Sequence, residues 1–411
     1  MNSSVHNLMW WKDPAYLQRF ISDLIFFELS QLRFANVIAI QRPWPLDTRI
    51  DIDLGADSLE LLSLGTALSE ALHLHESGIE DALLARRSLG DWVDTAQKGL
   101  EYFSQRLTFR TSGSSGTPKA CAHDFSALWQ EVEELSPMFE GRHRLYSAVP
   151  SHHIYGFIFT ILLPQALGIS SGNVIDLRSS SPARLSRDLQ PGDLVVGHPE
   201  FWHAFGRTVP HLAANIYGVT STAPCPDHVS YALQQAGLAT FFHIYGSTES
   251  AGIGWRTDLR EPYQLFSYLS FTETEQPSTL LRSLPGGSNV CINVQDELQP
   301  QNQQSFLVGP RHDAAVQVGG INVFPQKVQN LLEQHPKISK AVVRLMRQDE
   351  GSRLKAFIVP DAAATDEVAL KRELQNWFET VLTVHEIPKA ITFGLQLPRS
   401  ASGKLSDWII D

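Results

Sequence analysis

The stretch from Leu107 to His123, LTFRTSGSSGTPKACAH, combines glycines, hydroxyl side chains and one lysine. Glycines let a backbone adopt positive φ angles and approach a ligand closely, and successive amides in such a loop can bind oxyanions. The lysine adds a point charge at the end of the loop. The composition therefore predicts phosphate binding. The candidate residues are Thr111, Ser112, Gly113, Ser114, Ser115, Gly116, Thr117 and Lys119.

The spacing excludes the P-loop of ATPases. That motif has a lysine directly after its second glycine and a hydroxyl residue after the lysine, whereas Thr117 and Pro118 separate Gly116 from Lys119 here. A flexible surface linker is the alternative, because runs of glycine and serine commonly serve as linkers. Residues 120–129 are expected to form a helix, and a loop that leads into a helix is a common anion site.

Five further motifs follow this loop along the chain. They are VPSHHIYGF (149–157), STAPCP (221–226), FHIYGSTES (242–250), GPRHDAAVQVGGINVFP (309–325) and LPRSASGKL (397–405). In this order and at these spacings, the set resembles the adenylate-forming superfamily of acyl-CoA synthetases, aryl-CoA ligases and peptide-synthetase adenylation domains. The resemblance extends from about residue 107 to the C-terminus. It implies an α/β ligase core followed by a small, mobile α+β domain.

The resemblance also implies the reaction. A carboxylate attacks the α-phosphate of ATP and expels pyrophosphate, and positioning and charge neutralisation dominate such chemistry. The glycine-rich loop is then expected to cradle the β- and γ-phosphates. The remaining AMP contacts implied by the motifs are Ala223 and Pro224 beside adenine, Tyr245 stacked on it, and Gly246.

Four residues receive catalytic roles from the same resemblance. Thr248 is expected to contact the α-phosphate, and Glu249 to hold Mg²⁺, a hard cation that prefers oxygen ligands. Lys404 is expected to bridge the carboxylate and the α-phosphate, and the alternative is a solvated C-terminal lysine. His153 is expected to line the acyl pocket, and the alternative is a histidine of the core.

A hinge and a ribose contact are expected near residue 311. In the resembling family, the small domain rotates about a residue that follows an arginine, so Arg311 would bind the ribose and Asp313 would be the hinge. The family's TGD segment, whose aspartate binds the ribose, is absent. Asp296 lies at a suitable distance upstream, and the alternative is a turn aspartate without a ligand.

The first hundred residues resemble an acyl carrier protein. The sequence DLGADSLELLSL (53–64) places Ser58 at the start of a helix, where the helix dipole would favour the phosphate of phosphopantetheine. Residues 17–34 and the segment SLGDWVDTA (88–96) would be the first and last helices of this carrier. An ordinary N-cap at Ser58 is one alternative. A diverged form of the usual opening ligase subdomain is another. Leu59, Leu62 and Leu68 are expected in the core.

These observations predict three domains: a helical acyl-carrier-like domain (1–104), an AMP-binding ligase core (105–312) and a mobile C-terminal ligase domain (313–411). In the last, helices are expected at 325–336 and 365–382, and strands at 340–346 and 353–359, from apolar spacing of helical and alternating type. The fold class is therefore α/β, with a small α+β domain at the C-terminus and a helical region at the N-terminus.

Composition restricts the partners. The 411 residues carry a net charge of −11, which argues against a nucleic-acid surface, and the three cysteines, Cys121, Cys225 and Cys291, have neither metal-site nor disulfide spacing. Without a signal peptide or an uninterrupted apolar span, a cytoplasmic protein without membrane contact is expected.

The expected function is ATP-dependent activation of a small carboxylic acid and transfer of the acyl group to a phosphopantetheine thiol. The carrier would be this chain's own Ser58 or a separate one, and a phosphopantetheinyl transferase would modify it. Resemblance to compact ligases of aryl-polyene pigment pathways suggests an aryl, hydroxybenzoate-like acid. The alternatives are a ligase that uses free coenzyme A and a catalytically inactive carrier or assembly protein. The oligomeric state is open, and a homo-oligomer could complete the acyl pocket.

Overall fold

The computed structural model describes residues 9–33, 43–111, 119–178, 180–272, 278–311, 315–319, 321–347, 349–361, 366–399 and 405–410. The chain forms two compact units. Among the described residues, the first extends to Gly309, and the second comprises the residues from Pro310 onward together with Thr111 and Lys119. Each unit has its own hydrophobic core. Among the described residues, no helix is long and apolar enough to cross a bilayer.

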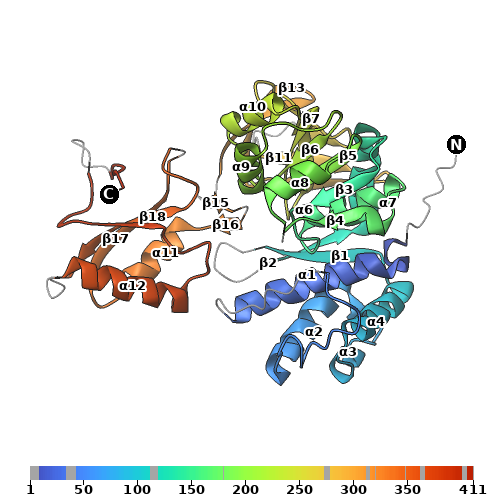
Figure 1. The fold of residues 1–411 in the computed structure, drawn as a ribbon, viewed down its shortest axis with the longest axis horizontal. Helices are drawn as coiled ribbons and strands as arrows, with labels where there is room; N and C mark the ends of the chain where they lie inside the picture. Colours follow the sequence, from blue (N-terminus) through green and yellow to red (C-terminus); the bar gives the residue numbers. More distant parts are fainter. Residues whose placement is uncertain are drawn as a thin grey trace. The chain divides into compact units, whose positions relative to one another are not determined.

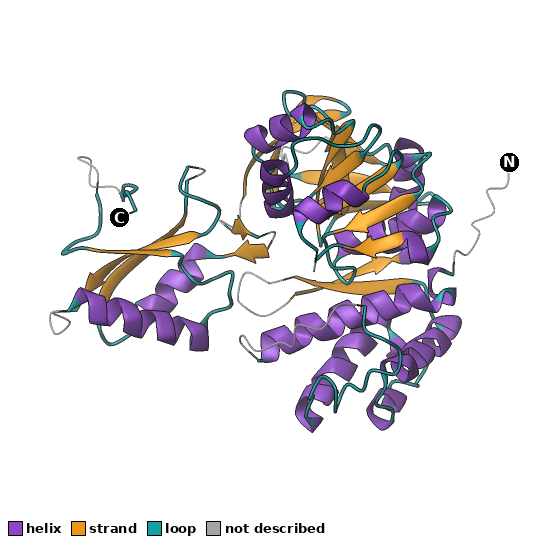
Figure 2. Cartoon of the chain, viewed as in Figure 1, coloured by secondary structure: helices purple, strands orange, loops and turns teal. Residues whose placement is uncertain are grey.

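A nine-stranded mixed sheet forms the centre of the first unit, with strand order β13-β14-β9-β8-β7-β6-β5-β3-β4 (Figures 1 and 2). The parallel strands are β3 (Arg144–Ser147), β4 (Val174–Asp176), β5 (Asp193–Gly197), β6 (Tyr217–Thr220) and β7 (Thr240–Ser247). The strands that follow are β8 (Ala251–Arg256), β9 (Tyr263–Leu265), β13 (Asp296–Asn302) and β14 (Ser305–Arg311). All five residues of β5 are buried, as expected for a parallel strand covered on both faces.

The order of connections creates a switch point between β3 and β5. From β3 the chain passes to β4 at the edge of the sheet and then returns to β5 on the other side of β3. In open α/β sheets, ligands bind outside the carboxyl ends of the strands at such a point. The topology therefore marks one edge of the sheet as the place for a site.

Helices cover both faces of this sheet. One face packs against α5 (Phe125–Leu135), α6 (Ile154–Phe157), the π-helical turn η4 (Ile158–Leu162) and α7 (Leu163–Ala166). The other packs against α8 (Pro182–Asp188), α9 (Pro199–Thr208) and α10 (Asp227–Gln235). Within β5, Leu194 and Val196 belong to the first core and Val195 to the second, which follows from the alternation of side chains along a strand.

Two smaller sheets complete this part of the chain. They consist of β1 (Arg106–Thr111) with β2 (Lys119–Asp124), and of β10 (Leu269–Phe271), β11 (Thr279–Ser283) and β12 (Asn289–Asn293). The helix expected over 120–129 is wrong in its first half, because β2 extends to Asp124 and α5 begins at Phe125. Cys121 and His123 are buried between exposed neighbours, which is the alternation of a strand.

The N-terminal region is helical, as the sequence predicts. Its helices are η1 (Trp10–Lys12), α1 (Pro14–Leu32), α2 (Ser58–Leu72), η2 (Leu74–Glu76), α3 (Asp81–Ala85) and α4 (Leu89–Tyr102). Asp13 caps α1, with proline at its first position, and capping boxes start α2 (Asp57 with Glu60) and α4 (Ser88 with Asp91). Figure 1 shows these helices beside β1.

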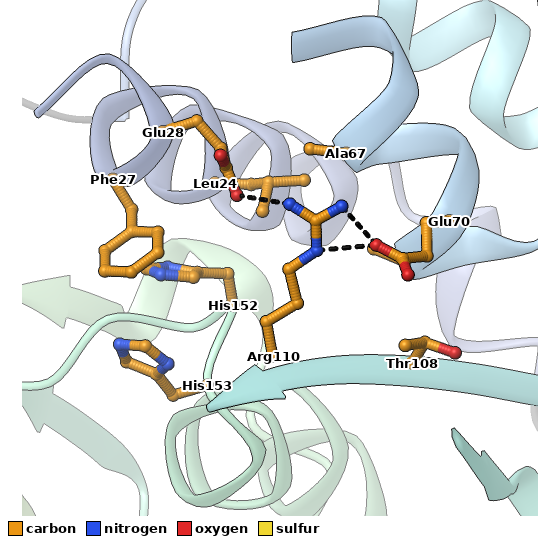
Figure 3. Close-up of a pocket in the computed structure, with 10 residues that line it drawn as sticks. Leu24, Phe27, Glu28, Ala67, Glu70, Thr108, Arg110, His152 and His153 are labelled. Carbon is orange, nitrogen blue, oxygen red and sulfur yellow. Dashed lines mark hydrogen bonds and ion pairs between the residues drawn. The ribbon is translucent and has the colours of Figure 1, made fainter. Parts of the chain in front are cut away.

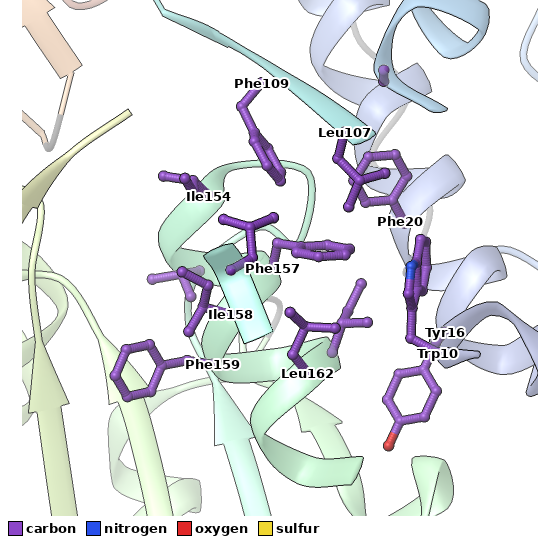
Figure 4. Close-up of a cluster of buried hydrophobic side chains, with 14 of the residues drawn as sticks. Trp10, Tyr16, Phe20, Leu107, Phe109, Ile154, Phe157, Ile158, Phe159 and Leu162 are labelled. Carbon is purple, nitrogen blue, oxygen red and sulfur yellow. The ribbon is translucent and has the colours of Figure 1, made fainter. Parts of the chain in front are cut away.

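These helices share one core with the ligase sheet (Figure 4). The ring of Phe157, in α6, lies 5.0 Å from that of Trp10, 5.8 Å from that of Phe20 and 5.4 Å from that of Phe109, measured between centroids. The hydroxyl of Tyr16 also donates a hydrogen bond to the carbonyl of Ile169, at 3.3 Å. The expected boundary at residues 104/105 is therefore not a boundary between compact units.

Helix α2 buries a different face from the one expected. Leu59 and Leu62 are 76% and 51% exposed, so their expected place in the core is wrong, whereas Leu68 is fully buried as expected. The buried leucines at 61, 64, 68 and 72 recur at helical spacing and form one stripe. The leucines on the other stripe contribute little to the core.

The second unit is a small α+β fold. Its elements are β15 (Val316–Val318), β16 (Ile321–Val323), α11 (Pro325–Leu332), β17 (Ile338–Leu345), β18 (Leu354–Pro360), α12 (Glu367–Val381) and β19 (Ala390–Phe393). Strands β17, β18 and β19 form one sheet, and α11 and α12 pack their apolar faces on it. The helices and strands expected from the sequence in this unit are confirmed, with shifts of a few residues at their ends.

We predict that replacing Phe20 with alanine lowers the free energy of unfolding of the first unit by about 3–5 kcal/mol, because it leaves a cavity in a shared core. Urea unfolding followed by circular dichroism measures this change. Leu59→Ala on the exposed stripe is the control, with an expected effect within about 0.5 kcal/mol. An intact ligase sheet in a protein whose N-terminal helices have melted would contradict the shared core.

Candidate functional site

Three motifs meet at the carboxyl edge of the parallel sheet. VPSHHIYGF follows β3, STAPCP follows β6, and the YGS of the YGSTES motif ends β7. Because β6 pairs in parallel with β7, with Thr220 opposite His243, the residues after β6 lie beside the end of β7. Segments that are far apart in the sequence thus reach the edge where ligands bind in open α/β sheets.

The turn after β7 holds Thr248 and Glu249 at its tip. The amide of Ser247 donates to Oγ of Ser250, and the amide of Ser250 donates to Oγ of Ser247, both at 3.2 Å. These reciprocal bonds close the turn, and both residues at the tip are partly exposed. The tip is therefore accessible to a phosphate and its metal ion, and the carboxylate of Glu249 is a suitable oxygen ligand for Mg²⁺.

Opposite a bulge in β8, where Ile253 is the extra residue, position 246 of β7 requires glycine. The register between β7 and β8 shifts between Tyr245 and Gly246. A Cβ at position 246 would lie 2.3 Å from the carbonyl oxygen of Ala251, so no other side chain fits there without movement of the backbone. Bulges redirect neighbouring side chains and are frequent beside active sites.

Tyr245 and Asp296 lie together. The hydroxyl of Tyr245 donates to Oδ2 of Asp296 at 2.6 Å, and its ring packs 5.6 Å from that of Tyr263 and 5.5 Å from that of Phe306. The guanidinium of Arg256 covers the ring of Tyr263 at 4.3 Å. The structure thus joins the aspartate at the start of β13 to the residue expected to stack on adenine.

A buried charge network positions the histidine segment after β3. Oδ2 of Asp23, on α1, accepts hydrogen bonds from the amide and the hydroxyl of Ser151, both at 2.8 Å. Arg178 binds Oδ1 of the same carboxylate at 2.6 Å and also pairs with Asp176. Asp23 is only 1% exposed. The first helix therefore holds the backbone directly before His152.

His153 lines a small pocket between α1, α2 and β1 (Figure 3). The pocket is lined by Leu24, Phe27, Glu28, Ala67, Glu70, Ala71, Thr108, Arg110, His152 and His153. Burial lowers the pKa of His153 to about 4, so its ring is neutral at physiological pH. The expected role of His153 in the acyl pocket stays a prediction.

The side chain of Arg110, near the end of β1, lines the same pocket. Its Nε donates to Glu70 at 2.5 Å and its Nη1 to Glu28 at 3.3 Å (Figure 3). Burial raises the pKa of Glu28, and the guanidinium of Arg110 opposes this rise. These ion pairs therefore tie α1 and α2 to β1.

Other expected site residues are placed only in part. Thr111 ends β1, Lys119 begins β2, Arg311 ends β14, and Ala223 and Pro224 lie in the loop after β6. Ser58 is exposed at the first position of α2. The positions 112–117, Asp313 and Lys404 lie outside the described residues.

Sequence reasoning missed Asp23 and Arg178. One signal was available, because Asp23 interrupts the apolar run of ISDLIFF on a helix that must bury one face. An acidic residue in such a place needs a buried partner. Nothing in the local sequence around Arg178 identifies it as that partner, since the pairing joins residues that are distant in the chain.

The sequence matches two family descriptions. Residues 108–284 match the AMP-binding enzymes, and residues 327–404 match the C-terminal domain of AMP-binding enzymes. The 4-coumarate–CoA ligase of Halorhodospira halophila is 37% identical over 361 residues, covering 87% of this chain and 90% of that protein. The ligase of the same name from Rhodobacter capsulatus is 33% identical over 407 residues, covering 95% and 100%.

Solved structures share the fold. An amide bond synthetase from Marinactinospora thermotolerans superposes with a TM-score of 0.60 at 15% identity, over 94% of this chain and 92% of that one. An o-succinylbenzoate CoA synthetase from Bacillus subtilis gives 0.57 at 17% identity, over 73% and 67%. At these identities the likeness concerns the fold alone.

We predict that Asp23→Asn lowers the free energy of unfolding by about 3 kcal/mol, because it removes one charge of a buried pair. Chemical denaturation measures this loss. Asp47→Asn, at an exposed position, is the matched control and should change stability little. Equal stability of the two variants would show that the network does not hold α1 to the histidine segment.

Proposed function

The chain belongs to the adenylate-forming superfamily of AMP-binding acyl-CoA ligases, and from this premise we propose that it joins 4-coumarate to coenzyme A at the expense of ATP. The main support is the likeness to proteins named 4-coumarate–CoA ligase along nearly their whole length. An aryl acid agrees with the acid class expected from the sequence. The acid proposed here is a hydroxycinnamate and not the hydroxybenzoate expected from the sequence. The expected link to an aryl-polyene pathway is not part of the proposal.

The proposed thiol is free coenzyme A instead of a carrier on Ser58. Two observations favour this choice. The N-terminal helices contribute Trp10 and Phe20 to the core of the ligase sheet, whereas a carrier domain normally folds around a core of its own. In addition, a relative named as a CoA ligase aligns with 95% of this chain, so most of the N-terminal region is shared with it.

Each residue of the site has a separate role in the proposed reaction. Bound Mg²⁺ would neutralise phosphate charge, with Glu249 as its oxygen ligand. Thr248 at the same exposed tip would bind the α-phosphate, while Tyr245 and Asp296 would hold the nucleoside. Lys404, outside the described residues, keeps its expected role beside the reacting carboxylate. Because catalysis of this kind depends on positioning, the closed turn after β7 and the bulge of β8 beside it are the main contribution of the described residues.

We predict that the purified protein converts 4-coumarate, ATP and coenzyme A to the thioester, and that Ser58→Ala retains the wild-type rate. Liquid chromatography with mass detection identifies the product. Cinnamate, 4-hydroxybenzoate and hexanoate test the choice of acid, and intact mass after treatment with a phosphopantetheinyl transferase tests Ser58. A rate that requires Ser58 and a pantetheine adduct would favour the carrier mechanism instead.

We also predict that Asp296→Asn raises the KM for MgATP about tenfold and leaves the KM for the acid unchanged, because the substitution weakens one charge-assisted contact in the nucleotide site. Initial rates with each substrate varied give both constants. Asp258→Asn is a suitable control, since Asp258 pairs with Arg260 at an exposed turn. Equal effects on both substrates would place Asp296 outside the nucleotide site.

A further inference from the structure

The turn that carries Thr248 and Glu249 is held from two sides by neighbouring elements. Nε2 of His123, on β2, lies 2.6 Å from the carbonyl oxygen of Thr248, so the ring donates to that oxygen. Oε2 of Glu131, on α5, accepts from the amide of Gly252 at 2.8 Å. These contacts fix the segment 247–252 near its tip and at its end.

The contact of Glu131 with residue 252 leaves no room for a side chain at that position. A Cβ at position 252 would lie 2.3 Å from Oε1 of Glu131 and 2.8 Å from the ring of Phe266. The carboxylate therefore rests directly against the glycine backbone. Next to it, Ala251 has a φ of 60°, a conformation that costs energy for a residue other than glycine. A strained backbone persists only where its surroundings hold it.

The carboxyl group of Glu131 is only 1% exposed. Burial raises its pKa to about 7, while the amide of Gly252 and the guanidinium of Arg282 oppose the rise and Glu134 adds to it. Arg282, 4% exposed, donates to the carbonyl of Ala127 and lies 4.5 Å above the ring of Tyr268. Among the described residues, Arg282, Glu134 and the phenol of Tyr268 are thus the titratable groups that interact with Glu131.

We propose that Glu131 is a positioning residue of the nucleotide site, which fixes the Gly252 end of the turn while His123 fixes Thr248, so that the turn holds AMP less tightly when Glu131 is neutral. This inference rests on the proposed function, because it assumes that residues 245–249 contact the nucleotide. The physical reason is that an ionised acceptor forms a hydrogen bond roughly twice as strong as a neutral one.

The stability of the fold must fall with rising pH, whereas the affinity for AMP rises. The pKa of Glu131 is about 7 in the folded state and 4.5 for an ordinary glutamate. At a pH between these two values, the carboxyl group is protonated in the folded state and ionised in the unfolded state. Its contribution to stability is full below the lower value and is lost as the pH rises through the higher one. At alkaline pH the buried charge of Glu131 therefore weakens the fold while it strengthens the contact with the turn.

The test compares wild type with Glu131→Gln, which keeps an acceptor oxygen but stays neutral. Isothermal titration calorimetry with AMP from about pH 5.5 to 8.5 should show wild-type affinity falling severalfold as the pH drops through about 7. In Glu131→Gln the affinity should be low and should lack the step at about pH 7, keeping only the change that comes from the second ionisation of the AMP phosphate, at about pH 6. The melting temperature of this variant should exceed that of wild type by a few degrees at about pH 8.5 and match it at about pH 5.5.

Glu134→Gln is the matched control one turn further along α5. Its carboxylate accepts from the amide and hydroxyl of Ser267, away from the turn after β7. This variant should keep a pH-dependent AMP affinity, with a lower midpoint, because the charge of Glu134 no longer adds to the rise in the pKa of Glu131. Loss of this step in Glu134→Gln, or its survival in Glu131→Gln, would overturn the proposal.

Failure of the proposed function gives a different pattern. If wild type binds AMP but makes no thioester from any acid, the proposed function fails, whereas the pH profiles still decide the role of Glu131. If wild type does not bind AMP at any pH, both fail. If Glu131→Gln binds AMP as wild type does while its melting temperature rises at alkaline pH, Glu131 has a structural role only and the inference is wrong.

Discussion

The carboxylate of Asp23 is the contact on which the arrangement of the site depends. It lies in the middle of the first helix, is shielded from water, and binds both the backbone before the two histidines and the guanidinium of Arg178. A buried charge is tolerated only where partners compensate it, so the helix, the histidine segment and the end of β4 must keep their relative positions. The N-terminal helices are thereby part of the ligase unit.

The same principle recurs around the turn after β7. Glu131 and His123 hold this turn through backbone groups, and Tyr245 binds Asp296 through a side chain. Residues that meet the nucleotide in the proposed reaction are thus supported by buried polar groups on other elements. Such support is what a reaction dominated by positioning requires. Its energetic consequence is a buried carboxyl at Glu131 that opposes the folded state when ionised.

The sequence predicted the family and the small α+β unit better than the contacts that support the site. Motifs with fixed order carried these predictions, because such patterns reflect local backbone requirements, whereas the roles of the site residues stay predictions. The role of the first hundred residues was harder to predict. A serine at a capped helix start is compatible with a carrier and with an ordinary helix, and only the packing of Trp10 and Phe20 against Phe157 reveals the shared core. Long-range pairs such as Asp23 with Ser151 leave no local pattern.

The most direct measurement is the exchange of labelled pyrophosphate into ATP, in the presence of 4-coumarate and the absence of any thiol. We expect exchange that depends on the acid, because the acyl-adenylate forms reversibly before coenzyme A is needed. No exchange with 4-coumarate or any other acid, from protein that is folded and binds AMP, would contradict the proposed ligase activity.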